Sequence, residues 1–213
     1  MGKVEKRQAR AKRVRKNRHK REVAAAAAPG APTPLELRFE SPGALQVFGP
    51  LIPGMWQVPA ALAEALAQVG RPVPQVVRGL FLIDTGASAT CIAEEVAAEL
   101  GLRAVGRRLT RGAHGTQTNN VYEARLSVTV PNNHGGPASV HADLQVSGIP
   151  ELASGNLGLR TPDGSPDRLI GLLGRDFLRY VTLTYNGAAG RITLQIDPSI
   201  PVVTGNPAGG SAS

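Results

Sequence analysis

The residues of this chain that are best suited to chemistry are an acid, a hydroxyl and a glycine in succession, Asp84, Thr85 and Gly86. The apolar residues 80–83 come directly before them, which predicts a buried strand that ends at the carboxylate. Gly86 supplies the permissive backbone that a sharp bend needs, and the hydroxyls of Thr85 and Ser88 can hydrogen-bond around the acid. The pattern therefore predicts an acid held in a tight turn, where it can take part in acid–base catalysis.

A second stretch of similar design lies near the far end of the chain, LIGLLGRDFL at residues 169–178. Its first five residues are apolar and predict a buried strand. Gly174 ends that strand, and residues 175–180 predict a helical turn that opens with Arg175 and Asp176. Three common residues such as Asp-Thr-Gly often occur together by chance. The first stretch therefore becomes informative about function because the second stretch is also present.

Together the two stretches resemble the retropepsin-like aspartic proteases, the single-domain relatives of the retroviral enzyme. In that family two hydrophobic residues and Asp-Thr-Gly-Ala/Ser carry the catalytic acid, and two hydrophobic residues with Gly-Arg-Asp/Asn follow later. Here Gly174 lies 90 residues after Asp84, and the resemblance covers residues 78–196. It implies a mostly β protein with a retropepsin-like closed β-barrel (the acid protease fold) and short helices, which agrees with the short strands and brief helices that the sequence predicts.

The resemblance also implies a role for each residue of the first motif. Asp84 is the expected catalytic acid and base, Thr85 is expected to lock two active-site loops across a dimer axis, and Gly86 to accept substrate at close range. Ala87 and Ser88 fill the next two positions of this active-site loop.

Hydrolysis of a peptide bond by this route needs two carboxylates that share one proton, because like charges so close cannot both ionise easily. The ionised member takes a proton from water, and the protonated member donates to the peptide carbonyl. The chain has no second Asp-Thr-Gly or Asp-Ser-Gly. We therefore expect a homodimer that pairs Asp84 of two copies and acts on polypeptide without a cofactor.

The chain departs from the retroviral pattern, which places acids immediately after Asp-Thr-Gly-Ala. Ser88 and Ala89 stand in their place. In the retroviral enzymes the arginine of the second segment pairs with one of those acids, so Arg175 lacks its expected partner, and Asp176 is a local candidate. Gly174, Arg175 and Asp176 are the expected dimer and structural residues.

Residues 109–121 contain RGAHGTQTNN, a composition that predicts a mobile hairpin tip. In the family the matching place is the flap that folds over the substrate, so the candidate substrate contacts are Gly112, Ala113, His114 and Gly115. The two glycines would let backbone amides approach the peptide closely. An ordinary surface hairpin is the alternative interpretation.

Periodicity predicts the other elements. Strands are expected at residues 35–39 and 45–48, and a short helix at residues 94–100. A helix is expected at residues 59–69, with Leu62, Leu66 and Val69 on one face, and Trp56 before it as a core or interface anchor. Period-2 runs predict one hairpin from residues 122–130 and 140–146 and another from residues 181–185 and 191–196.

The net charge of +8 comes from one end of the chain. Residues 1–22 hold eleven Lys and Arg and two Glu, and the rest of the chain holds 13 basic and 14 acidic residues. We expect a disordered basic arm at residues 1–23, an Ala/Pro linker at 24–34, the protease-like domain at 35–197 with its core at 78–196, and a disordered tail at 198–213. The arm is either a solvated tail or a non-specific contact for nucleic acid or an anionic surface.

Composition also excludes several classes of protein. A single cysteine, Cys91, rules out an internal disulfide and suits a packing role. Four histidines without ligand spacing argue against a metal site, and no apolar run is long enough for a membrane span. We therefore expect a cytoplasmic aspartic endopeptidase. The alternative is a catalytically inactive, protease-like scaffold that its basic arm tethers to nucleic acid.

Overall fold

The computed structural model describes residues 35–40, 42–112, 115–132, 136–153, 157–158 and 168–197. The expected basic arm, the Ala/Pro linker and the C-terminal tail lie outside the described residues. So do Ala113 and His114 of the expected flap. The predictions made for those segments stay predictions.

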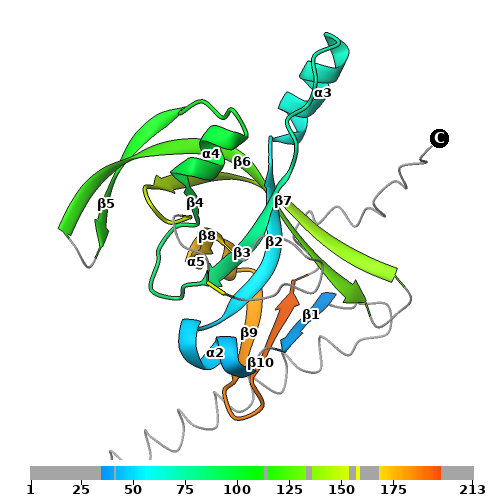
Figure 1. Ribbon diagram of the computed structural model, residues 1–213, viewed down its shortest axis with the longest axis vertical. Coiled ribbons are helices and arrows are strands. Elements are labelled where there is room, and N and C mark those ends of the chain that lie inside the picture. Colours follow the sequence, from blue (N-terminus) through cyan, green and yellow to red (C-terminus); the bar gives the residue numbers. More distant parts are fainter. Residues whose placement is uncertain are drawn as a thin grey trace, which may run out of the picture. The chain divides into compact units, whose positions relative to one another are not determined.

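Seven described strands form a sheet that closes on itself (Figure 1). Their order is β2–β3–β8–β4–β7–β6–β5, and β6 also pairs with β2, so that six strands make a ring and β5 extends from β6. The predicted mostly β fold with a closed sheet and short helices is confirmed. The strands are β2 (Leu51–Gln57), β3 (Val77–Ile83), β4 (Cys91–Ala93), β5 (Gly106–Gly112), β6 (Gly115–Asn132), β7 (Gly136–Ile149) and β8 (Leu169–Leu173).

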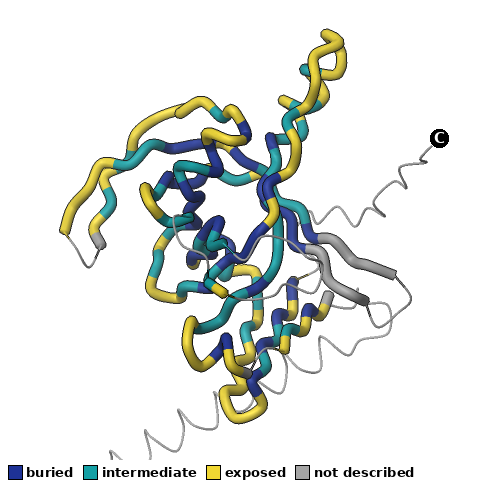
Figure 2. Tube along the Cα trace, viewed as in Figure 1, coloured by how far each residue is buried: buried dark blue, intermediate teal, exposed yellow. Residues whose placement is uncertain are grey.

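The core of this sheet lies where β2, β3 and β8 meet. The rings of Trp56 and Phe81 pack edge to face with their centroids 5.2 Å apart. The indole Nε1 of Trp56 donates to the carbonyl of Ile170 at 3.0 Å, which satisfies its one buried donor. Both aromatic side chains are fully buried, so the expectation of a core role for Trp56 is confirmed. Figure 2 shows where the buried parts of the chain lie in this sheet.

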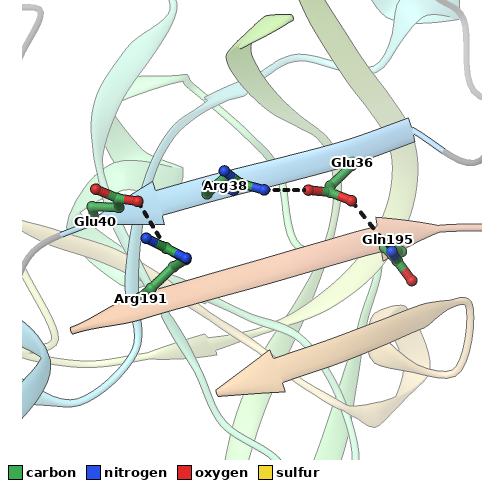
Figure 3. Close-up of polar contacts among 5 residues, drawn as sticks. All are labelled: Glu36, Arg38, Glu40, Arg191 and Gln195. Carbon is green, nitrogen blue, oxygen red and sulfur yellow. Dashed lines mark hydrogen bonds and ion pairs between the residues drawn. The ribbon is translucent and has the colours of Figure 1, made fainter. Parts of the chain in front are cut away.

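A second, three-stranded sheet has the order β1–β10–β9 and is formed by β1 (Leu35–Glu40), β9 (Val181–Asn186) and β10 (Arg191–Ile196). The predicted strand at residues 35–39 and the predicted C-terminal hairpin are thereby confirmed. One face carries a ladder of polar contacts between β1 and β10 (Figure 3). In this ladder Arg191 pairs with Glu40 at 2.7 Å, and Gln195 donates to Glu36 at 3.3 Å.

The strand predicted at residues 45–48 is wrong, because the chain forms helix α2 (Pro42–Phe48) there. Ala44 and Leu45 are both buried although they are neighbours in sequence. Two adjacent buried positions fit one face of a helix and not the alternation of a strand. Pro42 stands at the first helical position, where its missing N–H costs no hydrogen bond.

The other predicted helices are present as α3 (Ala60–Gln68), α4 (Glu94–Glu99) and α5 (Arg175–Leu178). Gly70 and Gly101, which follow the first two helices, have positive φ angles of 67° and 63° and so favour the helix ends there. The apolar face expected on α3 covers nothing in the described structure. No residue of α3 is buried, and the helix projects from the β2–β3 connection (Figure 1).

The long hairpin of β6 and β7 has the predicted antiparallel pairing, with Val128 opposite Val140. Ser127, which the alternation places on the polar face, is nevertheless fully buried, because β2 pairs with β6 at this point. Its Oγ lies 2.6 Å from Nδ1 of His141 and accepts a hydrogen bond from Gln57 Nε2 at 2.8 Å. A buried hydroxyl is thus satisfied by two side chains.

The His141 contact makes stability depend on pH. Burial lowers the pKa of His141, and the nearby Arg125 cation lowers it further. The unfolded chain, with an ordinary histidine pKa of 6.5, therefore binds the proton more tightly than the folded one. We expect the free energy of unfolding to fall as the pH drops from about 7.5 to 5.5, and to fall less in His141→Asn. Urea denaturation of both proteins measures this, and identical pH dependences would contradict it.

Candidate active site

The two sequence motifs meet because β3 and β8 are parallel neighbours, with Ile83 opposite Leu173. Parallel strands end at the same edge of a sheet, so the residues that follow them lie close together. Asp84 follows β3, and its backbone N–H donates to the carbonyl of Leu173 at 3.0 Å. Gly174 and α5 follow β8 at the same edge. The two motifs, which the sequence only suggested belong together, therefore lie side by side in the structure.

The carboxylate of Asp84 is held on one side by its own loop. Oδ1 accepts the backbone N–H groups of Gly86 at 2.8 Å and of Ala87 at 3.2 Å. No described residue donates to Oδ2. Asp84 is half-buried, whereas Thr85, Gly86 and Ser88 are exposed. The loop thus fixes the direction of the carboxylate and leaves one oxygen open to a proton, a water or a second carboxyl group.

Arg175 supports this loop from α5. Its Nη1 donates to the carbonyl oxygens of Thr85 at 3.0 Å and Gly86 at 2.8 Å, and its backbone N–H donates to the carbonyl of Ala87 at 3.0 Å. The absent acid partner of Arg175 is therefore replaced by backbone carbonyls of the active-site loop. Guanidinium donors on carbonyl oxygens are charge-assisted and hold the loop against the start of α5.

Asp176, suggested as the partner of Arg175, instead binds Thr90, and that suggestion was wrong. Its two carboxylate oxygens accept the backbone N–H of Thr90 at 2.8 and 2.9 Å, and Oδ1 also accepts the Thr90 hydroxyl at 2.7 Å. The same hydroxyl oxygen accepts the N–H of Gly174 at 3.2 Å. Thr90 is fully buried, so this cross-link lies under the active-site loop.

Sequence analysis missed Thr90. The one signal available was a hydroxyl six residues after Asp84 within an otherwise apolar run. A buried hydroxyl needs a hydrogen-bond partner, and the acid of the second motif was unassigned.

The glycines of the expected flap lie at the tip of the β5–β6 hairpin. Gly112 pairs with Gly115, whose φ of 108° is a conformation that side-chain-bearing residues rarely adopt. The hairpin itself is confirmed. Contact of Gly112 and Gly115 with a substrate stays a prediction.

Cys91 lies beside the site and is buried, in agreement with the expected packing role. Burial raises its pKa to about 11, and the carboxylates of Asp176 and, less strongly, Asp84 act in the same direction. The Arg108 cation lowers it. At neutral pH Cys91 is therefore a protonated thiol, which makes it a weak nucleophile.

The described residues contain no group of three or more His, Cys, Asp and Glu side chains that could hold a metal ion. Within the same ranges, no helix combines the length and the apolar character that crossing a membrane requires.

Comparison with known families gives one match. A family model described as aspartyl protease matches residues 73–177, which contain Asp84-Thr85-Gly86, the β5–β6 hairpin and the segment from Gly174 to Asp176. No curated protein matches the chain.

The fit of Gly174 under the loop leads to a test of the local packing. A Cβ at this position would lie 2.4 Å from the carbonyl carbon of Ala89 and 2.5 Å from its oxygen, and both are backbone atoms. We expect Gly174→Ala to lower the free energy of unfolding by about 2–4 kcal/mol, because the loop must move to admit the methyl group.

Chemical denaturation measures this change, with Gly106→Ala as the matched control. A Cβ at Gly106 meets no atom within 4 Å, and φ there is not positive. An unfolding midpoint of Gly174→Ala equal to that of Gly106→Ala would show that the loop is not packed as described.

Proposed function

The match over residues 73–177 makes this chain a member of the retropepsin-like aspartyl protease family, and from this we propose that it is an aspartic endopeptidase. The observation that supports the proposal best is the geometry of Asp84. Its loop orients one carboxylate oxygen through two backbone N–H groups and leaves the other free of described donors. A general acid or base in hydrolysis needs this combination of fixed direction and open access.

The proposed catalytic unit contains two copies of the chain, with Asp84 of each facing the other. One carboxyl group is ionised and takes a proton from a water molecule, whose oxygen attacks the carbonyl carbon of the peptide bond. The other is protonated and donates its proton to the carbonyl oxygen. When the tetrahedral intermediate collapses, the first carboxyl group passes the proton it took from water to the leaving nitrogen, and the second takes back a proton from a hydroxyl of the intermediate. The peptide bond breaks, and the pair again holds one proton. The reaction needs no cofactor.

Three features favour a second copy as the source of the second acid. The chain contains one Asp-Thr-Gly. The acid nearest in the second motif, Asp176, is engaged by Thr90 and so is not available to share a proton with Asp84. Thr85 and Gly86 are exposed in the single chain, at the surface where a symmetry-related loop would lie.

The three-stranded sheet offers a place for the second copy to bind. Its two edges are β1 and β9. β1 carries three charged residues, of which Glu40 and Glu36 contact β10 and Arg38 pairs with Glu36 (Figure 3). β9, with the sequence VTLTYN, carries no charge. Tyr180 just before it and Tyr185 within it are 41% and 53% exposed.

Proteins usually protect an exposed edge strand with charge, proline or a bulge, and an edge without charge invites another strand. β9 also follows α5 directly, so a strand added at this edge would bring the second copy next to the active-site loop. We therefore take β9 as the edge that pairs between copies.

The β5–β6 hairpin is the proposed flap. In it Gly112 and Gly115 would bring backbone amides to the substrate, as the resemblance implies. The basic arm, with eleven Lys and Arg in residues 1–22, favours a separate role in localising the protease on an anionic partner. A catalytically inactive scaffold with the same arm is the competing proposal.

The decisive variant is Asp84→Asn. Asparagine keeps a side-chain oxygen to accept the N–H groups of Gly86 and Ala87, so the loop should persist, but it cannot exchange the shared proton. We expect cleavage of an unbiased peptide mixture between about pH 4 and 7 to fall about a thousandfold or more in this variant. Wild-type cleavage should rise faster than linearly with protein concentration wherever the dimer is incompletely assembled.

The matched control is Asp143→Asn, which removes a carboxylate from the exposed pair with Arg125 and should leave cleavage intact. Equal rates of peptide cleavage by the wild type and by Asp84→Asn would contradict the proposal. Absence of cleavage by a folded, dimeric wild-type protein at every pH would favour the inactive scaffold.

A further inference from the structure

The described arginines divide into two groups. One group has carboxylate partners within ion-pair distance, namely Arg38, Arg125, Arg168 and Arg191. The other group has no such partner among the described residues. It includes the arginine that supports the active-site loop and every arginine of β5, namely Arg175, Arg107, Arg108 and Arg111.

The sequence around the site explains why these cations are unpaired. Residues 85–93 contain no acid, although the retroviral pattern has acids there. Residues 100–122, which include β5 and the tip of the hairpin, contain four arginines and no acid. This stretch therefore has a charge of +4, with histidine neutral, whereas residues 23–213 together sum to −1.

Arg108 is the flap arginine that faces the site. Along β5, Arg107, Leu109 and Arg111 are exposed, and Arg108 is half-buried on the opposite face. Its Nη1 reaches across to Ser147 Oγ at 3.4 Å, and Ser147 pairs in register with Cys91.

Arg108 and Asp84 also act on the same buried group. The charges of Arg108 and of Asp84 both act on the thiol of Cys91, in opposite directions. The cation and the carboxylate therefore lie within electrostatic reach of one buried atom.

Arg175 is exposed beside the loop that carries Asp84. Only its Nη1 makes side-chain hydrogen bonds, to the carbonyls of Thr85 and Gly86. Nε and Nη2 have no described partner, so the guanidinium is held by the loop and still presents donors outward. A fixed guanidinium with free donors is well suited to bind a carboxylate.

We propose that this site selects acidic polypeptide segments, with carboxylate side chains on either side of the scissile bond bound by Arg108 and Arg175. Cleavage of such segments rests on the proposed function. The preference for acidic segments concerns binding and can be measured without cleavage. A substrate segment rich in Lys and Arg would meet like charge at both positions. The chain's own basic arm, residues 1–22, is therefore a poor substrate for this site.

Binding can be tested without cleavage by using Asp84→Asn as the receptor. Three fluorescent peptide pools share a randomised apolar centre and carry Glu, Gln or Lys at the flanking positions. We expect the Glu pool to bind about tenfold more tightly than the Gln pool in low salt, and the Lys pool to bind most weakly. Added salt should reduce the difference, because exposed charges are screened.

Single substitutions in the Asp84→Asn background assign the preference to residues. Arg108→Gln and Arg175→Gln should each reduce the advantage of the Glu pool several-fold. Arg71→Gln removes the same charge from an exposed loop before β3, at the end of that strand away from Asp84, and should change nothing. Arg175→Gln also loses the loop contacts, so its fold is checked by circular dichroism, and Arg108→Gln supplies the test if that variant unfolds.

The outcomes separate the inference from the proposed function. Equal affinity for the Glu and Gln pools, binding of none of the pools, or a preference that both arginine substitutions leave unchanged would overturn the inference. Wild-type cleavage of all pools with equal kcat/KM would overturn it as well, while leaving the protease proposal intact. Charge-dependent binding without wild-type cleavage would instead count against the protease proposal alone.

Discussion

The whole site depends on the close parallel pairing of β3 with β8, because it brings together two motifs that lie 90 residues apart. The pairing leaves no room for side chains at several points. A Cβ at Gly79 would lie 2.5 Å from the side chain of Ile170, and one at Gly171 would lie 2.9 Å from the ring of Phe81. Glycine at these positions is thus a requirement of packing. Asp84 then follows directly from a tightly packed part of the sheet, which suits a group whose direction must be fixed.

Two connections carry this rigidity from the sheet into the loop. Asp176 binds the buried Thr90 beneath the loop, and Arg175 binds the carbonyls of Thr85 and Gly86 at its outer side. In the retroviral pattern an acid after the motif would engage that arginine. Its loss here frees part of the guanidinium without releasing the loop. The absence of that acid therefore leaves Asp84 supported by the loop but changes the charge that a substrate would meet.

Much of the fold was predictable from the sequence, because the pattern of apolar and polar residues in each strand reflects which of its faces are buried. The continuous apolar run before Asp84 reflects a strand paired on both sides, and the period-2 runs of β6 and β7 reflect a hairpin with one buried face. The partners of Arg175 and Asp176 could not be predicted, since spacing does not reveal which way a side chain turns. The helix at α2 and the uncovered surface of α3 depend on tertiary contacts that local periodicity does not encode.

The central claim is that one active site needs Asp84 from two copies, and mixing experiments test it most directly. Wild-type protein is held at a fixed concentration while Asp84→Asn protein is added and allowed to exchange subunits, and peptide cleavage is measured. If the pair is shared, mixed dimers lack one acid, and activity should fall toward zero as the variant comes into excess. If activity stays constant while subunit exchange is demonstrated independently, each chain carries a complete site and the shared pair is contradicted.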